Sequence, residues 1–301
     1  MTTAILLNPT AGGGRAAAVW GQLRAAPGVA DLPLLVGDDA GDLFRRLDGI
    51  LDQELERLVV VGGDGTLNLA VNHLLERQRE DVILGLVPAG NGSDLVRHLG
   101  LPREPRAALA NALTGPPRAL DALCLTTVDG RRRHAINVLS MGVSGIAGQI
   151  VNQGPRRSAL TYLKAALTAL RRYQPVPCRV LADEETEPWF AGDILLLAVA
   201  NGAYFGKGMK IAPDARVDDG LAEITLVEPI PFYQIPFKIP RLFLGGLLAL
   251  RQVHHRQARR LRLEPMGVLP PFDMDGEVMV SARAEIEVLP GKLRVAAGTT
   301  G

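Results

Sequence analysis

The stretch 58–68 combines the three parts of a phosphate-binding turn. It begins with four apolar residues, three of them β-branched, which is typical of a short buried strand. A Gly-Gly-Asp-Gly turn follows at 62–65, and from Thr66 apolar residues recur at helical spacing. Glycine lets the backbone approach a ligand closely, and a helix N-terminus favours negative charge. The stretch predicts a phosphate site, although an ordinary strand–helix turn with a capping aspartate has the same pattern.

Asp64 adds a carboxylate to this turn. An acid that faces phosphate groups requires a cation between the two, and Mg²⁺ is the cation that usually accompanies bound phosphates. We therefore expect a magnesium–nucleotide rather than a free phosphate at this turn.

Two further glycine-rich loops follow apolar segments. The loop at 8–14 comes between a predicted strand at 4–7 and a predicted helix at 15–25, and it lacks the lysine of a P-loop. The loop at 88–94 follows a predicted strand at 82–87 and carries Asp94. The remaining elements predicted in this half are a strand at 32–36 and helices at 42–51, from about 95, and at 106–113. Alternating strands and helices predict a parallel sheet, at whose carboxyl edge the three loops converge on a ligand.

The pattern changes after Gly115-Pro116-Pro117, and we place a domain boundary near Ala119. Downstream, short apolar segments between turn residues predict a β-rich domain, and Asp129-Gly130 indicates a hairpin. The predicted strands are 122–128, 134–139, 176–181, 194–200, 222–227, 284–289 and 293–297, with a helix at 158–173 and a shaped glycine-rich loop at 201–213.

Three acidic residues, Asp273, Asp275 and Glu277, alternate near the end of the chain. In an extended chain they share one face, where like charges repel unless they hold a cation or take up protons. An acidic hairpin turn is the alternative interpretation.

The block 230–262 is apolar at first and then basic. An apolar helix with a basic flank can lie on an anionic membrane surface. A helix packed in the core and followed by a solvated strand fits the same pattern, and both interpretations stay open.

Composition narrows the class of protein. The chain has 301 residues, of which 47% are hydrophobic, and its net charge of +1 argues against a nucleic-acid-binding protein. Cys124 and Cys178 lie far apart and are predicted to be reduced core residues. The start of the chain lacks the features of a signal peptide, and no apolar run is long enough for a transmembrane helix. We therefore expect a cytoplasmic protein.

The motifs together resemble the diacylglycerol kinase catalytic family of lipid kinases, which includes bacterial diacylglycerol and phospholipid kinases and sphingosine and ceramide kinases. The resemblance covers nearly the whole chain in the right order. It rests on Asn8-Pro9 with its glycines, Gly62–Thr66, Pro88–Asp94, Asn137 with Ser140–Gly142, Asn201–Pro213, Asp219-Gly220 and Asp275–Glu277. NAD kinases share the Gly-Gly-Asp-Gly-Thr motif, so the later motifs are what favour lipid kinases.

The resemblance implies an α/β fold followed by a β fold. An N-terminal Rossmann-like α/β nucleotide domain, similar to those of NAD kinase and phosphofructokinase, would span 1–119, with the last strand at about 290–301 joined to it. A C-terminal β-sandwich-like domain would span 120–289 and bind the lipid, with the active site in the cleft between the domains. The implied cofactors are ATP and Mg²⁺, and the implied partner is a lipid substrate at a membrane surface, which makes the protein peripherally membrane-associated.

The resemblance also implies functional residues by position. The nucleotide would be lined by Asn8, Pro9, Thr10, Ala11, Gly12, Gly62, Gly63, Asp64, Gly65, Thr66, Leu67, Asn68, Leu69, Asn91 and Asp94, with Asp64 and Asp94 reaching its Mg²⁺ through water. A structural Mg²⁺ would bind the carbonyls of Arg216 and Leu221 and the carboxylate of Asp219. Asp275 and Glu277 would supply the general base, and we expect Asp275 to take the lipid hydroxyl proton.

One position departs from the family pattern, because Ser93 stands where the family usually has asparagine before the aspartate. The alternatives to a lipid kinase are a soluble-substrate kinase of the NAD kinase kind and a nucleotide- or lipid-binding regulator without turnover. The sequence leaves open which lipid accepts the phosphate and whether the protein forms a homodimer.

Overall fold

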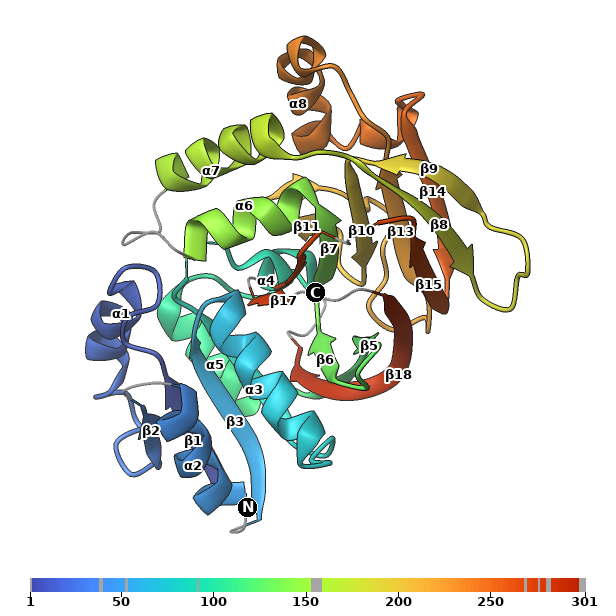
Figure 1. Cartoon of the computed structure of the whole chain (residues 1–301). Helices are drawn as coiled ribbons and strands as arrows, with labels where there is room; N and C mark the ends of the chain where they lie inside the picture. The colour runs from blue at the N-terminus through green and yellow to red at the C-terminus, as the bar shows by residue number, and fades with distance from the viewer. Residues whose placement is uncertain are drawn as a thin grey trace. The chain divides into compact units, whose positions relative to one another are not determined.

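The computed structural model describes residues 2–37, 40–51, 54–90, 92–152, 159–267, 270–275, 277–279 and 283–297 (Figure 1). The chain forms two compact units. Unit 1 comprises Met1–Leu120 and Gly291–Gly301, and unit 2 comprises Asp121–Pro290.

Unit 1 contains the predicted parallel sheet. Its strands are β1 (Thr2–Leu7), β2 (Leu34–Val36), β3 (Leu55–Gly62) and β4 (Ile83–Pro88), in the order β2-β1-β3-β4. All neighbouring pairs are parallel, and the end of β18 (Ala284–Ala296) joins beside β4 in the same direction. The helices are α1 (Arg15–Leu23), α2 (Ala40–Leu51), α3 (Asp64–Glu76), α4 (Asp94–His98) and α5 (Pro105–Thr114).

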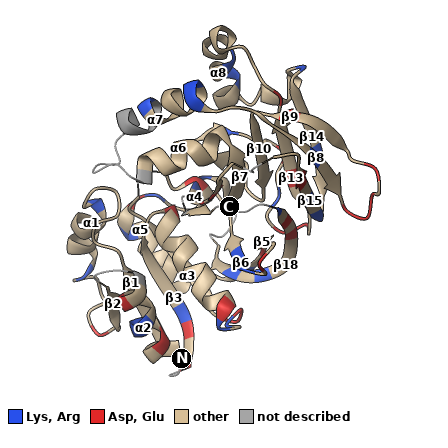
Figure 2. Cartoon of the chain, in the orientation of Figure 1, with Lys and Arg blue, Asp and Glu red and all other residues tan. Residues whose placement is uncertain are grey.

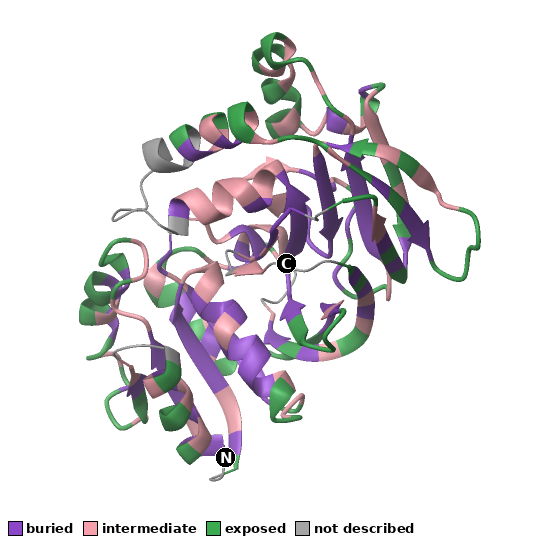
Figure 3. Cartoon of the chain, viewed as in Figure 1, coloured by how far each residue is buried: buried purple, intermediate pink, exposed green. Residues whose placement is uncertain are grey.

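Helices cover both faces of this sheet. Val59 and Val61 of β3 share a buried cluster with α1 and α5. Val60 points to the other face, as strand alternation requires, and borders a small hollow together with Leu67 of α3. With both faces covered, β3 is buried from Leu58 to its end and begins this part with four consecutive apolar residues, as in other buried parallel sheets (Figure 3).

Unit 2 consists of two mainly antiparallel sheets that enclose one core. One sheet has the order β14-β13-β10-β7-β16-β17, and β9-β8-β15-β18 with the β5–β6 pair forms the other. Their bounds are β5 Pro117–Thr127, β6 Arg132–Ala135, β7 Val138–Gly142, β8 Val176–Ala182, β9 Phe190–Ile194, β10 Leu196–Ala200, β13 Ala222–Val227, β14 Val253–Ala258, β15 Arg260–Pro265, β16 Phe272–Met274 and β17 Glu277–Met279. Alternate residues of both sheets meet in a single buried cluster, which confirms the sandwich-like fold.

The other elements of unit 2 are mostly helical. They are α6 (Val143–Asn152), α7 (Ala159–Arg172), the 3₁₀ turns η1 (Phe232–Gln234) and η2 (Leu247–Ala249), α8 (Ile235–Leu244) and the short pair β11 (Tyr204–Phe205) and β12 (Met209–Lys210). No helix among the described residues combines the length and apolar character needed to cross a membrane.

Two sequence predictions of local structure are corrected, and one helix was not predicted. The predicted strand at 134–139 is two strands, β6 and β7, which belong to different sheets and separate at Ile136 and Asn137. The strands predicted at 284–289 and 293–297 are one continuous strand, β18. Helix α6 was not predicted, because its glycines resemble a turn. One of them, Gly145, allows close packing, since a Cβ there would lie 1.7 Å from the carbonyl oxygen of Pro271.

Candidate functional site

The three glycine loops of unit 1 converge, as the sequence predicts. The N–H groups of Ala89 and Gly90 both donate to the carbonyl oxygen of Gly62, at 2.8 and 3.0 Å. The N–H group of Asn8 donates to the carbonyl oxygen of Val61 at 3.2 Å. The carboxyl ends of β1, β3 and β4 are therefore joined by backbone hydrogen bonds.

Glycine is required where these loops meet. A Cβ on Gly90 would lie 2.4 Å from the Cα of Gly63, and a Cβ on Gly12 would lie 2.4 Å from the carbonyl oxygen of Ala89. Gly12 also has a φ of +65°, which side chains rarely adopt. The glycines thus allow the loops to pack backbone against backbone.

Asn8 links the first loop to the start of α3. Its Nδ2 donates to Thr66 Oγ1 at 3.1 Å, while its Oδ1 accepts from the N–H and the hydroxyl of Thr10, at 3.2 and 2.8 Å. These bonds fix the Asn-Pro-Thr turn beside the N-terminus of α3.

The carboxylates of Asp64 and Asp94 lie on the same side of the third loop. Asp64 Oδ2 accepts the N–H of Ser93 at 2.9 Å. A Cβ on Gly92 would lie 2.7 Å from Asp64 Oδ2 and 3.7 Å from Asp94 Oδ2. Asp94 is buried, and its Oδ1 lies 3.6 Å from Arg97 Nη1. Two acids so close together are suited to face a cation.

Ser93 adopts the left-handed backbone conformation, with a φ of +56°. Asparagine tolerates this conformation better than serine does. The departure from the family pattern therefore costs backbone strain at the residue whose N–H holds Asp64. Asn91, a predicted nucleotide contact, lies outside the described residues.

The predicted nucleotide residues on α3 divide into two groups. The side chains of Thr66, Leu67 and Asn68 are buried, so their contacts with a ligand would run through the backbone. Gly65 has open space where a Cβ would stand, with no atom within 4 Å. The other predicted residues of α3, Asp64 and Leu69, are partly exposed, as are Pro9, Ala11 and Gly63 in the loops, whereas Gly62 is buried.

A hollow of about 20 Å³ lies beneath these loops and is lined by Val60, Leu67, Leu86 and neighbouring residues. That volume holds about one water molecule, whereas ligand pockets measure hundreds of Å³. A nucleotide would therefore bind on the outer side of the loops, where Gly13, Gly14 and Gly65 leave open space. The α3 N-terminus, the open glycines and the two carboxylates fit a magnesium–nucleotide.

In unit 2, Asp275 occupies the turn of a tight hairpin between β16 and β17. Met274 pairs with Glu277, and Asp275 has a φ of +52°, which two-residue hairpin turns require. The extended arrangement with Asp273, Asp275 and Glu277 on one face is therefore wrong, because Asp-Gly favours a turn. Gly276 lies outside the described residues, and the backbone of Glu277 begins β17.

The Asp275 carboxylate accepts three backbone hydrogen bonds. Its Oδ2 accepts from the N–H groups of Ile136 and Asn137 at 2.8 and 3.2 Å, and its Oδ1 accepts from Val138 at 3.0 Å. The N–H of Asp275 also donates to the carbonyl oxygen of Val138 at 3.3 Å. One side chain thus joins the hairpin to the segment between β6 and β7.

The buried residue Asn201 holds the same segment from its carbonyl side. Its Nδ2 donates to the carbonyl oxygens of Ile136 and Asp121, each at 2.9 Å. The N–H groups of Asn201 and Gly202 donate to the carbonyl oxygen of Asn137 at 2.8 and 3.0 Å. The sequence showed these asparagines only as parts of family motifs; their positioning role depends on contacts distant in the chain.

The predicted structural metal residues lie on the loop before β13. Asp219 Oδ1 accepts the N–H of Leu221 at 3.0 Å. Buried Asp121, which the sequence did not single out, anchors the loop: its Oδ2 accepts from the N–H of Gly220 at 2.7 Å, and its own N–H donates to Val217 at 2.6 Å. Among the described residues no group of three acidic, histidine or cysteine side chains could hold a metal. A cation here would depend on backbone carbonyls, which are suitable ligands for Mg²⁺.

His134 is a buried titratable residue just before the segment 136–138, whose N–H groups bind the Asp275 carboxylate. Burial lowers the pKa of His134 to about 4, and the charges of Arg132 and Arg133 act in the same direction. His134 is therefore neutral at pH 7, and protonating it opposes burial of β6.

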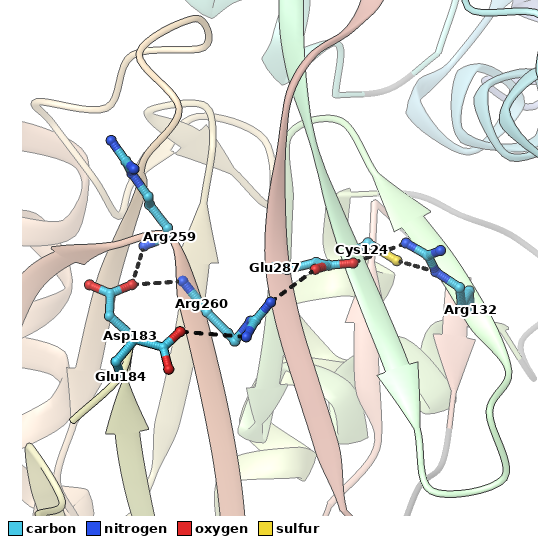
Figure 4. A network of polar contacts seen from close by, with 7 residues as sticks. All are labelled: Cys124, Arg132, Asp183, Glu184, Arg259, Arg260 and Glu287. Carbon is cyan, nitrogen blue, oxygen red and sulfur yellow. Dashed lines mark hydrogen bonds and ion pairs between the residues drawn. The ribbon is translucent and has the colours of Figure 1, made fainter. Parts of the chain in front are cut away.

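A second polar network crosses the other sheet of unit 2 (Figure 4). Asp183 accepts the N–H groups of Arg259 and Arg260, and Arg260 lies 3.8 Å from Glu287. Arg132 donates to Glu287 at 3.0 Å and to Cys124 Sγ at 3.2 Å. Burial raises the pKa of the Cys124 thiol. Both cysteines are free and buried, as predicted. The network links residues on different strands of the sheet, and we assign it a role in joining them.

Comparison with known proteins matches both units to family models. Residues 2–125 match the diacylglycerol kinase catalytic domain. Residues 137–297 match the YegS C-terminal NAD kinase beta sandwich-like domain. The two models together span nearly the whole chain.

Similar proteins carry kinase names. A diacylglycerol kinase of Mycobacterium tuberculosis is 28% identical over 294 residues, which cover 96% of this chain and 93% of the relative. A "Probable lipid kinase YegS-like" of Chromohalobacter salexigens is 30% identical over 271 residues, covering 86% and 81%. A crystal structure of a diacylglycerol kinase from Bacillus anthracis has a TM-score of 0.72 at 19% identity, covering 99% and 97% of the two chains, which shows a shared fold.

Proposed function

The chain belongs to the diacylglycerol kinase catalytic family, and we propose that it transfers a phosphoryl group from ATP to the hydroxyl group of a lipid. The observation that carries the proposal is the convergence of three glycine loops with two carboxylates at the start of α3. The names of the relatives, which are lipid or diacylglycerol kinases, support a lipid acceptor.

Unit 1 binds the nucleotide in this proposal. The N–H groups at the start of α3 and in the loop at 8–14 bind phosphate oxygens, because the glycines there leave these backbone groups accessible to a ligand. Asp64 and Asp94 face the Mg²⁺ of the nucleotide through water. That ion, when bound, neutralises the charge of the transferred phosphate.

Unit 2 supplies the base. The sequence favoured Asp275, but the bonding of Asp275 supports a positioning role for it, and we therefore propose Glu277 as the base. Three backbone N–H groups hold the Asp275 carboxylate. Accepting a proton would weaken these bonds, since hydrogen bonds to an ionised group are about twice as strong as neutral ones. In this assignment Glu277 takes the hydroxyl proton as the lipid oxygen attacks the γ-phosphorus of ATP, whose bond to the bridging oxygen breaks so that ADP leaves.

The same proposal assigns a structural Mg²⁺ to the carbonyls of Arg216 and Leu221 and the carboxylate of Asp219. The loop is already ordered by Asp121, and Asp219 Oδ1 is turned toward Leu221. The role of this ion is to hold the loop before β13, away from the chemical step.

The test is transfer of labelled phosphate from ATP to a panel of lipids in mixed micelles. The panel contains diacylglycerol, phosphatidylglycerol, a long-chain base and an isoprenoid alcohol, with NAD as a soluble acceptor. We expect one lipid to be labelled, in a reaction that chelation of divalent cations abolishes. Labelling of NAD alone would contradict the lipid assignment, and ATP binding without transfer to any acceptor would indicate a regulator.

A further inference from the structure

Helix α8, with the turn η1 before it, presents an apolar surface to solvent. No residue of either element is buried, and Phe237 and Leu244 are each 82% exposed. Tyr233 and Phe243 are 72% and 51% exposed, and Figure 3 shows exposed residues over most of α8. A surface helix ordinarily turns polar residues to solvent, so the usual pattern is reversed here.

The inward side of α8 is identified by its contacts. Ile235, Lys238 and Leu242 are half-buried and lie at helical spacing along one side. Leu242 packs on the buried cluster that contains Leu247, and Lys238 Nζ donates to Gln252 Oε1 at 3.2 Å. The helix is therefore docked on unit 2, and its exposed aromatic residues form its outward side.

Basic residues lie beside this apolar surface, and the chain segments that form it contain no acidic residues. The sequence has no Asp or Glu between positions 229 and 263 or between 130 and 182, the stretches that contain α8 and α7. The guanidinium of Arg171, at the end of α7, lies 5.5 Å from the centre of the Phe232 ring. Figure 2 shows basic and no acidic residues on both helices. Tyr233, Phe237, Phe243 and Leu244 with Arg171 and Arg241 are named here the α8 surface.

We propose that the α8 surface docks the protein on an anionic lipid bilayer. Phe237 and Leu244 enter the boundary between headgroups and acyl chains, where aromatic and aliphatic side chains are stabilised. Arg171 and Arg241 contact acidic headgroups. A two-fold dimer through the same surface would instead bring identical cations together. The inference rests on the proposed function only in that a lipid acceptor lies in a membrane.

The test measures sedimentation of the full chain with vesicles, without nucleotide. The vesicles are phosphatidylcholine alone or phosphatidylcholine with phosphatidylglycerol. We expect binding that increases with phosphatidylglycerol and decreases with salt. The double variant Phe237→Ser/Leu244→Ser is expected to bind at least about tenfold more weakly, because two apolar side chains no longer enter the lipid.

Two further double variants test the contribution of the charges and the contribution of exposed apolar side chains elsewhere on the protein. In Arg171→Gln/Arg241→Gln, the preference for vesicles that contain phosphatidylglycerol is expected to fall roughly tenfold or more, because each cation contributes about fivefold to that preference. The control Leu34→Ser/Val128→Ser alters side chains that are 42% and 67% exposed elsewhere, and it should bind like the wild type. Circular dichroism checks that each variant is folded.

Equal vesicle binding by the wild type and Phe237→Ser/Leu244→Ser would overturn the proposal, as would no binding by the wild type. A dimer abolished by those substitutions, with vesicle binding unchanged, would assign the surface to a second copy. Transfer to lipid in detergent micelles is measured separately. If phosphate is transferred to a lipid but the protein does not bind vesicles, the docking proposal is wrong and the kinase proposal stands. If the protein binds vesicles as expected but transfers phosphate to no lipid, the kinase proposal is wrong and the docking proposal stands.

Discussion

The loops of unit 1 are held by backbone against backbone, whereas the turn at Asp275 in unit 2 is joined to the segment 136–138 mainly by one carboxylate. In unit 1 the loops pack closely at glycines, such as Gly63 and Gly90, because glycine has no side chain to hold the backbones apart. In unit 2 the side chain of Asp275 bonds to N–H groups as far as 139 positions away in the chain. The first arrangement is sensitive to added atoms, and the second to a lost charge.

This difference can be tested in each unit separately, because the chain has two tryptophans. Trp20 packs against the buried cluster of unit 1, and Trp189 packs against that of unit 2. A Trp20→Phe background therefore reports on unit 2 by fluorescence, and a Trp189→Phe background reports on unit 1.

The largest effect is expected for Gly90→Ala. The new Cβ would lie 2.4 Å from the Cα of Gly63, so the loops must separate. We expect unit 1 to lose at least about 3 kcal/mol of unfolding free energy in urea, and ATP binding to be lost. Gly65→Ala is the matched control, because its Cβ meets no atom within 4 Å. Equal stability of the two variants would contradict the packing argument.

Asp275→Asn should destabilise unit 2 by about 3 kcal/mol while leaving unit 1 unchanged. An amide has one acceptor oxygen for three N–H donors, and hydrogen bonds to charged groups contribute about 1.5–3 kcal/mol each. Trp189 fluorescence in urea measures the change. Asp129→Asn, in the β5–β6 hairpin, is the control, since among the described residues Asp129 bonds to its near neighbours Thr127 and Arg131. A fully stable Asp275→Asn variant would show that the carboxylate does not hold the hairpin.

Acid should weaken unit 2 through His134. Its pKa of about 4 lies below the ordinary value of 6.5, so the unfolded chain binds the proton more readily. The stability that neutral His134 permits above pH 6.5 is lost as the pH falls toward 4, by roughly 3 kcal/mol in total. Urea titrations at several pH values should show this loss in the wild type and a smaller one in His134→Leu. Identical pH profiles would contradict burial of a neutral imidazole.

The smallest effect is expected for Asp64→Asn, which removes charge without removing the bond to Ser93. The amide oxygen can still accept that N–H, so the loops stay joined and Trp20 fluorescence should report an unchanged unit 1. Calorimetry should show Mg-ATP binding weakened about tenfold, which corresponds to about 1.4 kcal/mol. Asp31→Asn, an exposed acid of the same unit, should bind normally. Normal binding by Asp64→Asn would remove Asp64 from the metal side of the nucleotide.

The sequence predicted the α/β fold, a β-rich second domain and the convergence of the loops, because those signals are local, whereas the sandwich-like arrangement was implied only by the family resemblance. A strand followed by glycine and a helix is visible within eleven residues, as in 58–68. The hairpin at Asp275 has a local signal, Asp-Gly, and was one of the two interpretations that the sequence left open. The break at Ile136 was not resolved, since it depends on the pairing of β6 and β7 with different strands that are distant in the chain. Asp121 and Asn201 carry no local signal at all, because their partners are backbone groups far along the chain.

The central claim is that Glu277 acts in catalysis while Asp275 acts in positioning. The direct test is the rate of phosphate transfer to the labelled lipid by Glu277→Gln, measured beside its ATP affinity and its Trp189 unfolding curve. We predict transfer reduced by about 10²–10⁴-fold, with ATP affinity and unfolding unchanged. Transfer at the wild-type rate by a folded Glu277→Gln variant would contradict the account.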